Sequence, residues 1–188
     1  MHDSAIVDIR QLPQRIRAEA IDMLYRQTGP MQLLSLLNSG FLVYLLWGEI
    51  ANRVLLAWLT LLVTAILAKS LLSYRYFKRP PNTTDRWGSL FTLSSLFSGL
   101  IWGSAGIFLF PPEQVAHQAI LFFLLTGMGA GAYVANTSYI AAFYAFFIPT
   151  LLPIIIRLTL EGDRLHTALA LWGLAFFFAF LFFARKAN

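Results

Sequence analysis

The stretch LHTALALWGLAFFFAFLFFA, from Leu165 to Ala184, contains no charged residue and is apolar almost throughout. A helix of about 20 residues spans the roughly 30 Å hydrocarbon core of a bilayer, so this stretch predicts a transmembrane helix. Five similar stretches precede it, and only short polar joints separate them. These five stretches are Met31 to Trp47, Val54 to Tyr74, Ser89 to Phe110, Val115 to Ala135, and Tyr139 to Ile156.

The predicted fold class is therefore all-α, a polytopic membrane protein with six transmembrane helices. None of the six stretches alternates with a period of two, which excludes the strands of an outer-membrane barrel. Hydrophobic residues make up 58% of the chain and charged residues 12%, a balance too apolar for a soluble surface of this size. The chain has no cysteine, which excludes disulfides, thiolate metal sites and cysteine nucleophiles.

The positions of Lys and Arg predict the orientation. Eleven of the fourteen basic residues fall on one side, which the positive-inside rule assigns to the cytoplasm together with both termini. They are Arg10, Arg15, Arg17, Arg26, Lys69, Arg75, Lys78, Arg79, Arg86, Arg185 and Lys186, whereas Arg53, Arg157 and Arg164 lie outside. The net charge of +5 is thus a topology signal, and we expect membrane lipid rather than nucleic acid as the partner of Arg75 to Arg86.

The first thirty residues predict a separate segment, giving residues 1–30 as a cytoplasmic N-terminal segment and residues 31–188 as the six-helix domain. They lack the apolar core of a signal peptide, so the first span should direct insertion. Gln14 to Gln27 predicts a short interfacial helix that Gly29 and Pro30 end. Its weak apolar side consists of Ile16, Ala20, Met23, Leu24 and Gln27. The same helix could instead dock a cytoplasmic partner or a second subunit.

Small residues gather in the third span. Gly99 and Gly103 form a G-x-x-x-G pair, and Gly106 continues the same helix face. Such a face lets another helix approach closely, and Gly127 and Gly131 give the fourth span a matching smooth surface. We expect the third and fourth spans to pack together here, with the seam of a homodimer as the alternative. The run from Gly127 to Gly131 lacks the spacing and the lysine of a nucleotide loop.

Pro149 and Pro153 lie four residues apart in the fifth span. Each proline removes a backbone donor and clashes with the preceding turn, which predicts a bend in this helix. The bend is either a static kink or a flexible point that a signal can move, which makes both prolines a candidate switch. Carbonyls freed by the bend could also receive a polar group of a ligand.

Polar side chains inside the spans are few. Lys69 lies about five residues from the cytoplasmic end of its span, so its long side chain should reach the inner headgroups rather than couple ion movement. Asn38, near the middle of the first span, should form an interhelical hydrogen bond. We also consider Asn38 and Trp102 as candidate ligand contacts, and with them Phe176 and Phe180 of the phenylalanine-rich sixth span.

The sequence offers no catalytic centre and no metal or cofactor site. His117 and His166 both lie near the predicted outer face, and they lack the carboxylate or further ligand that a metal or haem would need. No paired carboxylates and no combination of Ser and His suggest catalysis. We therefore expect that this chain by itself is not an enzyme.

A series of short patterns runs through the chain in a fixed order. The patterns are Leu24-Tyr25 before Pro30, Leu46-Trp47, Arg86-Trp87, the run from Gly99 to Gly103, Phe110-Pro111, the run from Gly127 to Gly131, and Pro149 with Pro153. Over residues 15–186 the chain resembles the N-terminal integral-membrane input region of bacterial diguanylate cyclases (GGDEF proteins) and hybrid sensor histidine kinases. The resemblance implies a sensor domain in a bacterial inner membrane. Its last helix would lead to a cytoplasmic output domain downstream of Asn188.

The predicted function is accordingly signal transduction. The domain would detect a membrane-associated or small hydrophobic ligand and pass a movement through its last helix to a cyclase or kinase. Such an input would act in cyclic-di-GMP or two-component signalling, and we expect a homodimer. The alternatives are a small membrane transporter and a structural membrane partner. The two halves of the chain show no similarity that would favour an inverted-repeat transporter.

Overall fold

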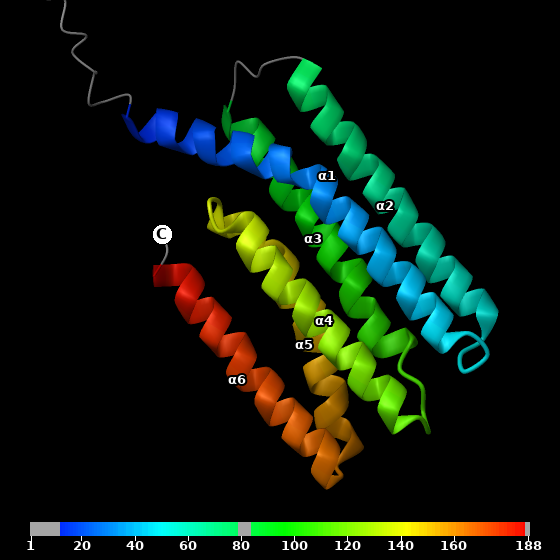
Figure 1. Ribbon diagram of the computed structural model, residues 1–188. Coiled ribbons are helices and arrows are strands. Elements are labelled where there is room, and N and C mark those ends of the chain that lie inside the picture. Colours follow the sequence, from blue (N-terminus) through cyan, green and yellow to red (C-terminus); the bar gives the residue numbers. More distant parts are fainter. Residues whose placement is uncertain (1–11, 79–83, 187–188) are drawn as a thin grey trace, which may run out of the picture.

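The structure is a computed structural model that describes residues 12–78 and 84–186, and this part of the chain forms six α-helices and no sheet (Figure 1). The helices are α1 (Leu12–Leu46), α2 (Asn52–Lys78), α3 (Thr84–Phe108), α4 (Val115–Asn136), α5 (Ile140–Glu161) and α6 (Arg164–Lys186). Each of the six is long and apolar enough to cross a membrane. The predicted all-α class and the six spans are therefore confirmed.

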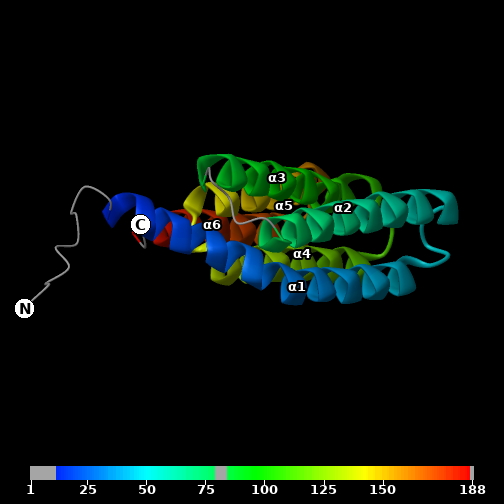
Figure 2. The ribbon, with the colours of Figure 1, turned by 90° about the horizontal axis from the view of Figure 1, so that it is seen from above.

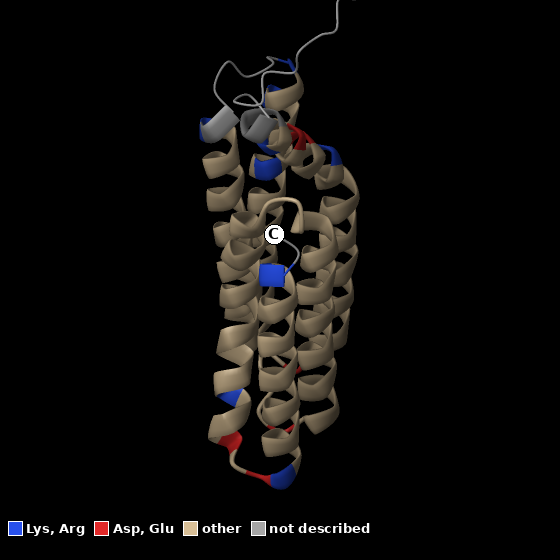
Figure 3. Cartoon of the chain, turned by 90° about the vertical axis from the view of Figure 1, so that its left-hand side faces the viewer, with Lys and Arg blue, Asp and Glu red and all other residues tan. Residues whose placement is uncertain are grey.

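Large apolar side chains cover the outside of the bundle. Leu37, Leu67, Leu171 and Phe178 are each more than half exposed, as only a lipid-facing surface favours. Charged residues gather at the two ends of the bundle and are nearly absent between them (Figure 3). The start of α1 and the end of α6 lie at the same end, as an even number of spans requires (Figures 1 and 2).

Helix α5 lies at the centre of the bundle, and its closest neighbour is α3. These two helices pack along most of their length, and α4 and α6 pack against the other sides of α5. Helix α1 lies against α2, α3 and α4, while α2 and α6 form opposite flanks of the bundle (Figure 1). Two of the helix connections contain a glycine with positive φ, Gly48 at 89° and Gly162 at 76°, a conformation that side chains oppose.

The separate interfacial helix predicted before the first span is wrong. Helix α1 is continuous for 35 residues and contains Pro30, although it changes direction along its length (Figure 1). The boundary expected at residue 30 is thus not a break in the chain. The predicted apolar side is right only in part, because Leu24 is buried as expected but Ile16 and Met23 are exposed, whereas Ile21 and Tyr25 are buried instead.

Packing explains why the helix continues through Pro30. Tyr25 stacks on Tyr76 of α2 with a ring-centroid distance of 4.0 Å, and its hydroxyl donates to the carbonyl of Trp87 in α3 at 3.0 Å. Ser73 of α2 donates to the carbonyl of Tyr25 at 3.3 Å. These contacts hold the first half of α1 inside the bundle, and tertiary packing of this kind overrides a local break signal. Tyr25, Tyr76 and Trp87 belong to a second apolar cluster that is separate from the main core.

The orientation stays a prediction that single cysteines can test, because the chain contains none of its own. Lys78 and Arg164 are both exposed, at opposite ends of the bundle. In whole cells, Arg164→Cys should react with a membrane-impermeant thiol reagent and Lys78→Cys should not. Lysis should make both sites react. Labelling of the Lys78 variant in intact cells would reverse the assigned orientation.

Candidate ligand cavity

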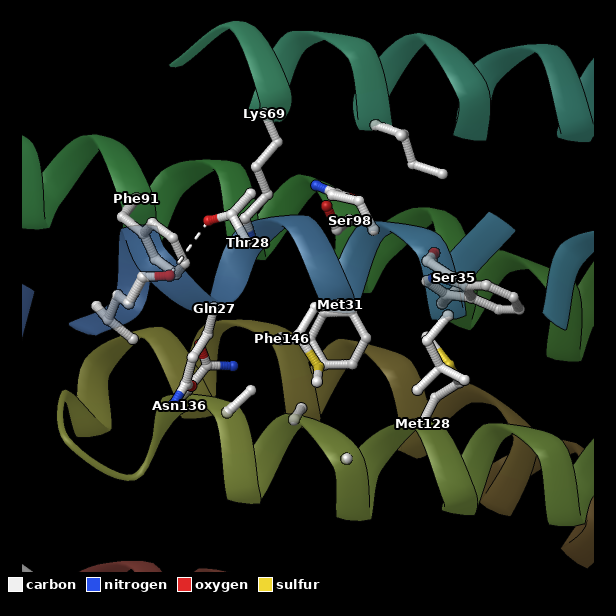
Figure 4. A pocket seen from close by; sticks show the side chains of 18 of the residues that line it. Gln27, Thr28, Met31, Ser35, Lys69, Phe91, Ser98, Met128, Asn136 and Phe146 are labelled. Atoms are coloured by element: carbon white, nitrogen blue, oxygen red, sulfur yellow. Dashed lines mark hydrogen bonds between the residues drawn. The ribbon is translucent and has the colours of Figure 1, made fainter. Parts of the chain in front are cut away.

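A cavity lies between the middle of α1 and helices α2, α3 and α4, with one residue of α5 in its wall (Figure 4). Its volume is about 70 Å³, and it is partly open to the outside of the bundle. Apolar and polar side chains contribute to the wall, but no Asp or Glu does. The wall residues used below are Gln27, Thr28, Gln32, Leu34, Ser35, Leu62, Ile66, Lys69, Phe91, Ser98, Trp102, Met128, Ala132, Ala135, Asn136 and Phe146.

Lys69 of α2 turns into this cavity, so the prediction that it extends to the headgroups is wrong. Its Nζ donates to Ser95 Oγ at 3.1 Å and lies 4.3 Å from the ring centroid of Phe91. Both partners belong to α3, where Ser95 and Phe91 are buried. The ring face and the hydroxyl attract the ammonium, and together they draw its flexible stem inward from the lipid.

The amides of two further helices meet near the same end of the cavity. Gln27 of α1 and Asn136 of α4 approach each other across the cavity (Figure 4). Gln27 Oε1 is buried and has no hydrogen-bond partner among the described residues. A buried polar atom without a partner costs free energy, which a polar group entering the cavity would recover.

The hydroxyls of the wall, by contrast, are used within the protein. Thr28 Oγ1 donates to the Leu24 carbonyl at 3.2 Å, and Ser98 Oγ donates to the Ser94 carbonyl at 3.0 Å. Each hydroxyl keeps acceptor capacity toward the cavity, but its donor is occupied. The Lys69 ammonium is the charged donor of this wall, and the amides of Gln27, Gln32 and Asn136 add neutral donors.

Trp102 is a wall residue of the cavity, as considered from the sequence. It is 1% exposed, and its Nε1 donates to Ser35 Oγ at 3.2 Å. Its ring meets Trp58 of α2 edge-on at 5.3 Å. Asn38 lies outside the wall but forms the expected interhelical contact, since its Nδ2 donates to Met128 Sδ at 3.0 Å.

Phe176 and Phe180 do not line this cavity. Their rings stack on each other at 4.3 Å, and Phe180 also stacks on Phe147 of α5 at 5.9 Å. Tyr133 of α4 meets Phe180 edge-on at 5.3 Å. The two phenylalanines thus join α6 to α4 and α5, and their place is a packing contact rather than a ligand contact.

The glycine face of α3 packs against α5 and not against α4 as predicted. A Cβ added to Gly99 would lie 2.5 Å from the Phe146 carbonyl oxygen, and one on Gly106 would lie 2.9 Å from Cβ of Ile154. Nothing lies within 4 Å of a Cβ added to Gly127 or Gly131, so these two are not packing glycines. Because α5 covers the α3 face, the alternative of a homodimer seam there is also wrong.

The two prolines of α5 face these glycines. A Cβ on Gly103 would lie 1.8 Å from the carbonyl oxygen of Pro149 and 3.2 Å from Cγ of Pro153. Residue 153 has no N–H to donate to that carbonyl, which instead faces the Cα of Gly103. A Cα–H can act as a weak donor to such an oxygen. The freed carbonyl expected from the sequence is therefore covered by α3 and not open to a ligand.

A polar network joins α4 to the start of α6 at the predicted outer end. His166 is buried and uses Nδ1 for Asp163 Oδ2 and Nε2 for Gln118 Oε1, the latter at 2.6 Å. Gln118 Nε2 donates to the Pro111 carbonyl at 2.6 Å, which fixes the orientation of its amide. Both ring nitrogens of His166 therefore have a partner, one on α4 and one at the start of α6.

Asp163 also begins α6 by accepting from the backbone N–H groups of Leu165 and His166 at 2.9 and 3.0 Å. The backbone N–H of His166, and then its ring, hold the pKa of Asp163 below its ordinary value. His117 does not join this network, and the described residues contain no cluster of three metal-ligating side chains. The two histidines therefore do not converge.

The lowered pKa of Asp163 predicts an acid-labile outer end. A depressed carboxyl pKa stabilises the fold above the unfolded value of about 4, and this contribution disappears as the pH falls through the folded value. Asp163→Asn keeps a helix-capping oxygen but loses the charge. At pH 7 this variant should therefore have a lower melting temperature than the unsubstituted protein. Melting in detergent at pH 3 should show a smaller difference. An unchanged difference would remove this role.

Sequence reasoning missed much of the cavity wall. Gln27 was assigned to a surface helix, and Asn136 lies just beyond the predicted fourth span. Ser98 and Met128 resemble many residues in membrane helices, so no local pattern marks them. Besides Trp102, the available signal was Lys69, because an ionisable side chain in a span is a functional pointer by default.

No known protein family, curated protein or solved structure matches this chain. The class that its fold defines is a multi-pass helical membrane protein with six candidate spans. Its distinguishing feature is the cavity that contains Lys69.

Proposed function

We propose that this chain is a membrane-embedded sensor domain that binds a small ligand in the Lys69 cavity. The observation that carries the proposal is the cavity itself, whose wall combines side chains of five helices, among them one ammonium and the three amides of Gln27, Gln32 and Asn136. Ligand pockets characteristically join a mostly apolar wall to a few convergent polar groups. A ligand that favours one arrangement of these helices shifts the bundle toward that arrangement.

A continuous series of aromatic contacts connects the cavity wall with α6. Tyr133 follows the wall residue Ala132, and its ring meets Phe143 of α5 at 5.7 Å. Phe147, next to the wall residue Phe146, stacks on Phe177 of α6 at 5.4 Å. Spatial continuity supports a route for movement toward the cytoplasmic end of α6, and the experiment below tests whether that route couples the two.

The output would be a cytoplasmic domain that receives the movement of α6. The resemblance to input regions of diguanylate cyclases and hybrid histidine kinases suggests a bacterial inner membrane and an enzyme downstream of Asn188. Two copies of this chain would bring two outputs together. In this proposal the sensor domain binds and moves, and the chemistry belongs to its partner domain.

Filling the cavity with a side chain of the protein tests the proposal without knowledge of the ligand. Ala135 is a buried wall residue, and its neighbour Val134 is 74% exposed on the same helix. Spin labels at Lys78→Cys and Arg185→Cys would report the separation of α2 and α6 at one end of the bundle. Ala135→Phe should shift this distance distribution, because it occupies the cavity, and Val134→Phe should not.

Identical distributions for both folded variants would contradict a sensor that couples this cavity to α6. Thermal melting of both variants would first establish that each remains folded. A shift caused by Val134→Phe alone would place the coupling on the lipid-facing side of α4 instead of the cavity. That result would also contradict the proposal.

A further inference from the structure

We infer that the ligand is an amphiphile with a single negative charge, whose head group pairs with Lys69 and whose apolar chain follows the apolar wall out to the lipid beside Leu34. The inference rests on the proposed function, because it assumes that the cavity binds a ligand, and it adds the chemical class. The shared chemistry is a monoanionic head group, which a fatty acid carboxylate or a lipid phosphodiester could supply.

The cavity has one positively charged side chain, Lys69. Lys69 Nζ donates to Ser95 Oγ, and no described carboxylate forms an ion pair with it. The wall contains no Asp or Glu. An ammonium without a counter-charge is costly at membrane depth, and an anion that binds beside it offsets this cost. One ammonium matches one negative charge, which favours a monoanion over a multiply charged head group.

The Lys69 ammonium has N–H bonds that can donate to a ligand. An ammonium has three N–H bonds, and among the described residues one of them has a hydrogen-bond acceptor, Ser95 Oγ. The Phe91 ring covers a further side of the group at 4.3 Å. An oxygen of the head group can therefore take a remaining N–H bond. Gln27 and Asn136 lie at the same end of the cavity and give the head group further polar neighbours (Figure 4).

The remainder of the wall fits an apolar chain. Ile66 and Leu62 precede Lys69 by about one and two turns of α2 respectively, so an apolar track continues from the ammonium along that helix. Trp102, Met128 and Phe146 complete the track from the other helices. Methionine adapts its shape readily, which suits a flexible chain. Leu34, which is 41% exposed, borders the cavity where it can communicate with surrounding lipid.

The experiment compares two photoreactive probes that differ only in charge. Twelve-carbon chains with a diazirine at the far end, one a carboxylate and the other an alcohol, are added to the full chain in phosphatidylcholine nanodiscs. Peptide mass spectrometry locates the cross-links. The carboxylate should label cavity residues such as Met128 and Ala132 about tenfold more than the alcohol does, because only the carboxylate pairs with Lys69.

Two lysine variants of the same helix provide the matched comparison. Lys69→Gln should lower cavity labelling by the carboxylate about tenfold and leave labelling by the alcohol unchanged. Lys78→Gln, at an exposed position of α2, should label as the unsubstituted chain does. Lys69→Arg should retain part of the carboxylate labelling, which separates loss of charge from loss of shape.

Competition identifies the source of the head group. Displacement of the carboxylate probe by dodecanoate but not by phosphatidylglycerol supports a carboxylate ligand, and the reverse supports a lipid phosphodiester. Equal labelling by both probes that Lys69→Gln does not change would overturn the charge inference while leaving the cavity as a binding site. Cross-links that avoid the cavity with either probe would contradict the proposed function as well.

Discussion

Gly103→Leu should destabilise the bundle more than any other single glycine substitution in α3. Its Cβ would lie 1.8 Å from the Pro149 carbonyl oxygen, an atom of the backbone that cannot turn aside. The helices α3 and α5 must then separate, which removes dispersion contacts along the closest interface of the fold. Overpacking of this kind costs about 3 kcal/mol or more, measured as a loss of thermal stability in detergent.

Gly127→Ala is the matched control, and its effect should have the opposite sign. This glycine lies within α4, and a Cβ there would meet nothing within 4 Å. Alanine favours a helix over glycine by about 1 kcal/mol, so this variant should melt slightly above the unsubstituted protein. Gly48 would serve poorly, because its φ of 89° strains any side chain. Similar melting temperatures for the Gly103 and Gly127 variants would contradict the close α3–α5 packing.

Replacing Pro149 and Pro153 together with alanine should remove the bend that the sequence predicts for α5 and slow the local opening of this helix. Alanine at position 149 can donate its N–H to the Ala145 carbonyl, and alanine at position 153 can donate to the carbonyl of residue 149. Both carbonyls are left without this donor by the prolines, and unpaired backbone groups are costly in lipid. The two lost rings contact only part of the α3 face. Amide hydrogen exchange between Ile154 and Arg157 should therefore slow by about tenfold, the equivalent of roughly 1.4 kcal/mol of local stability.

The same double variant should fix the position of α6, if the bend supplies the alternative arrangements of the bundle. Spin-label distances between residues 78 and 185 should then no longer respond to Ala135→Phe. Leu152→Ala, a lipid-facing change in the same helix, should preserve the response. If Ala135→Phe still shifts the spin-label distances in the proline variant, the bend is static. The change in amide hydrogen exchange would then report only the local stability of α5.

The six spans could be predicted because lipid requires long apolar helices, and apart from the start of the first span their ends agree with the structure to within about five residues. The break at Pro30 could not be judged correctly from local signals. Its outcome depended on Tyr25 finding Tyr76 and Trp87, which are about fifty and sixty residues further along the chain. Local propensity is a weak prior against such packing.

The packing glycines of α3 were correctly recognised, and their partner was not. A G-x-x-x-G pattern states that a helix comes close but contains no information about which one. The smooth run in α4 suggested a match, yet the complementary surface is the pair of prolines in α5, which sequence reasoning had treated as a separate feature. Both features describe one interface, in which Gly103 leaves room for the carbonyl that Pro153 cannot satisfy.

Lys69 shows the limit of reading one helix at a time. Its depth near the end of α2 allowed an outward or an inward direction. Only the positions of Ser95 and Phe91 on a different helix decide between them. The cavity wall has the same character, because its members are ordinary on their own helices and become a site where five helices meet.

Because α1 is one continuous helix, the residues that it contributes to the cavity wall are connected rigidly to its N-terminal part. Its 35 residues would extend over roughly 52 Å at the usual rise per residue, far more than the roughly 30 Å of hydrocarbon. The helix therefore extends beyond the hydrocarbon, and Gln27, Thr28 and Ser35 of the same helix line the cavity. No loop separates the two parts, so a movement of the outer part of α1 would reach the cavity wall, and by linkage a ligand bound in the cavity would displace that outer part.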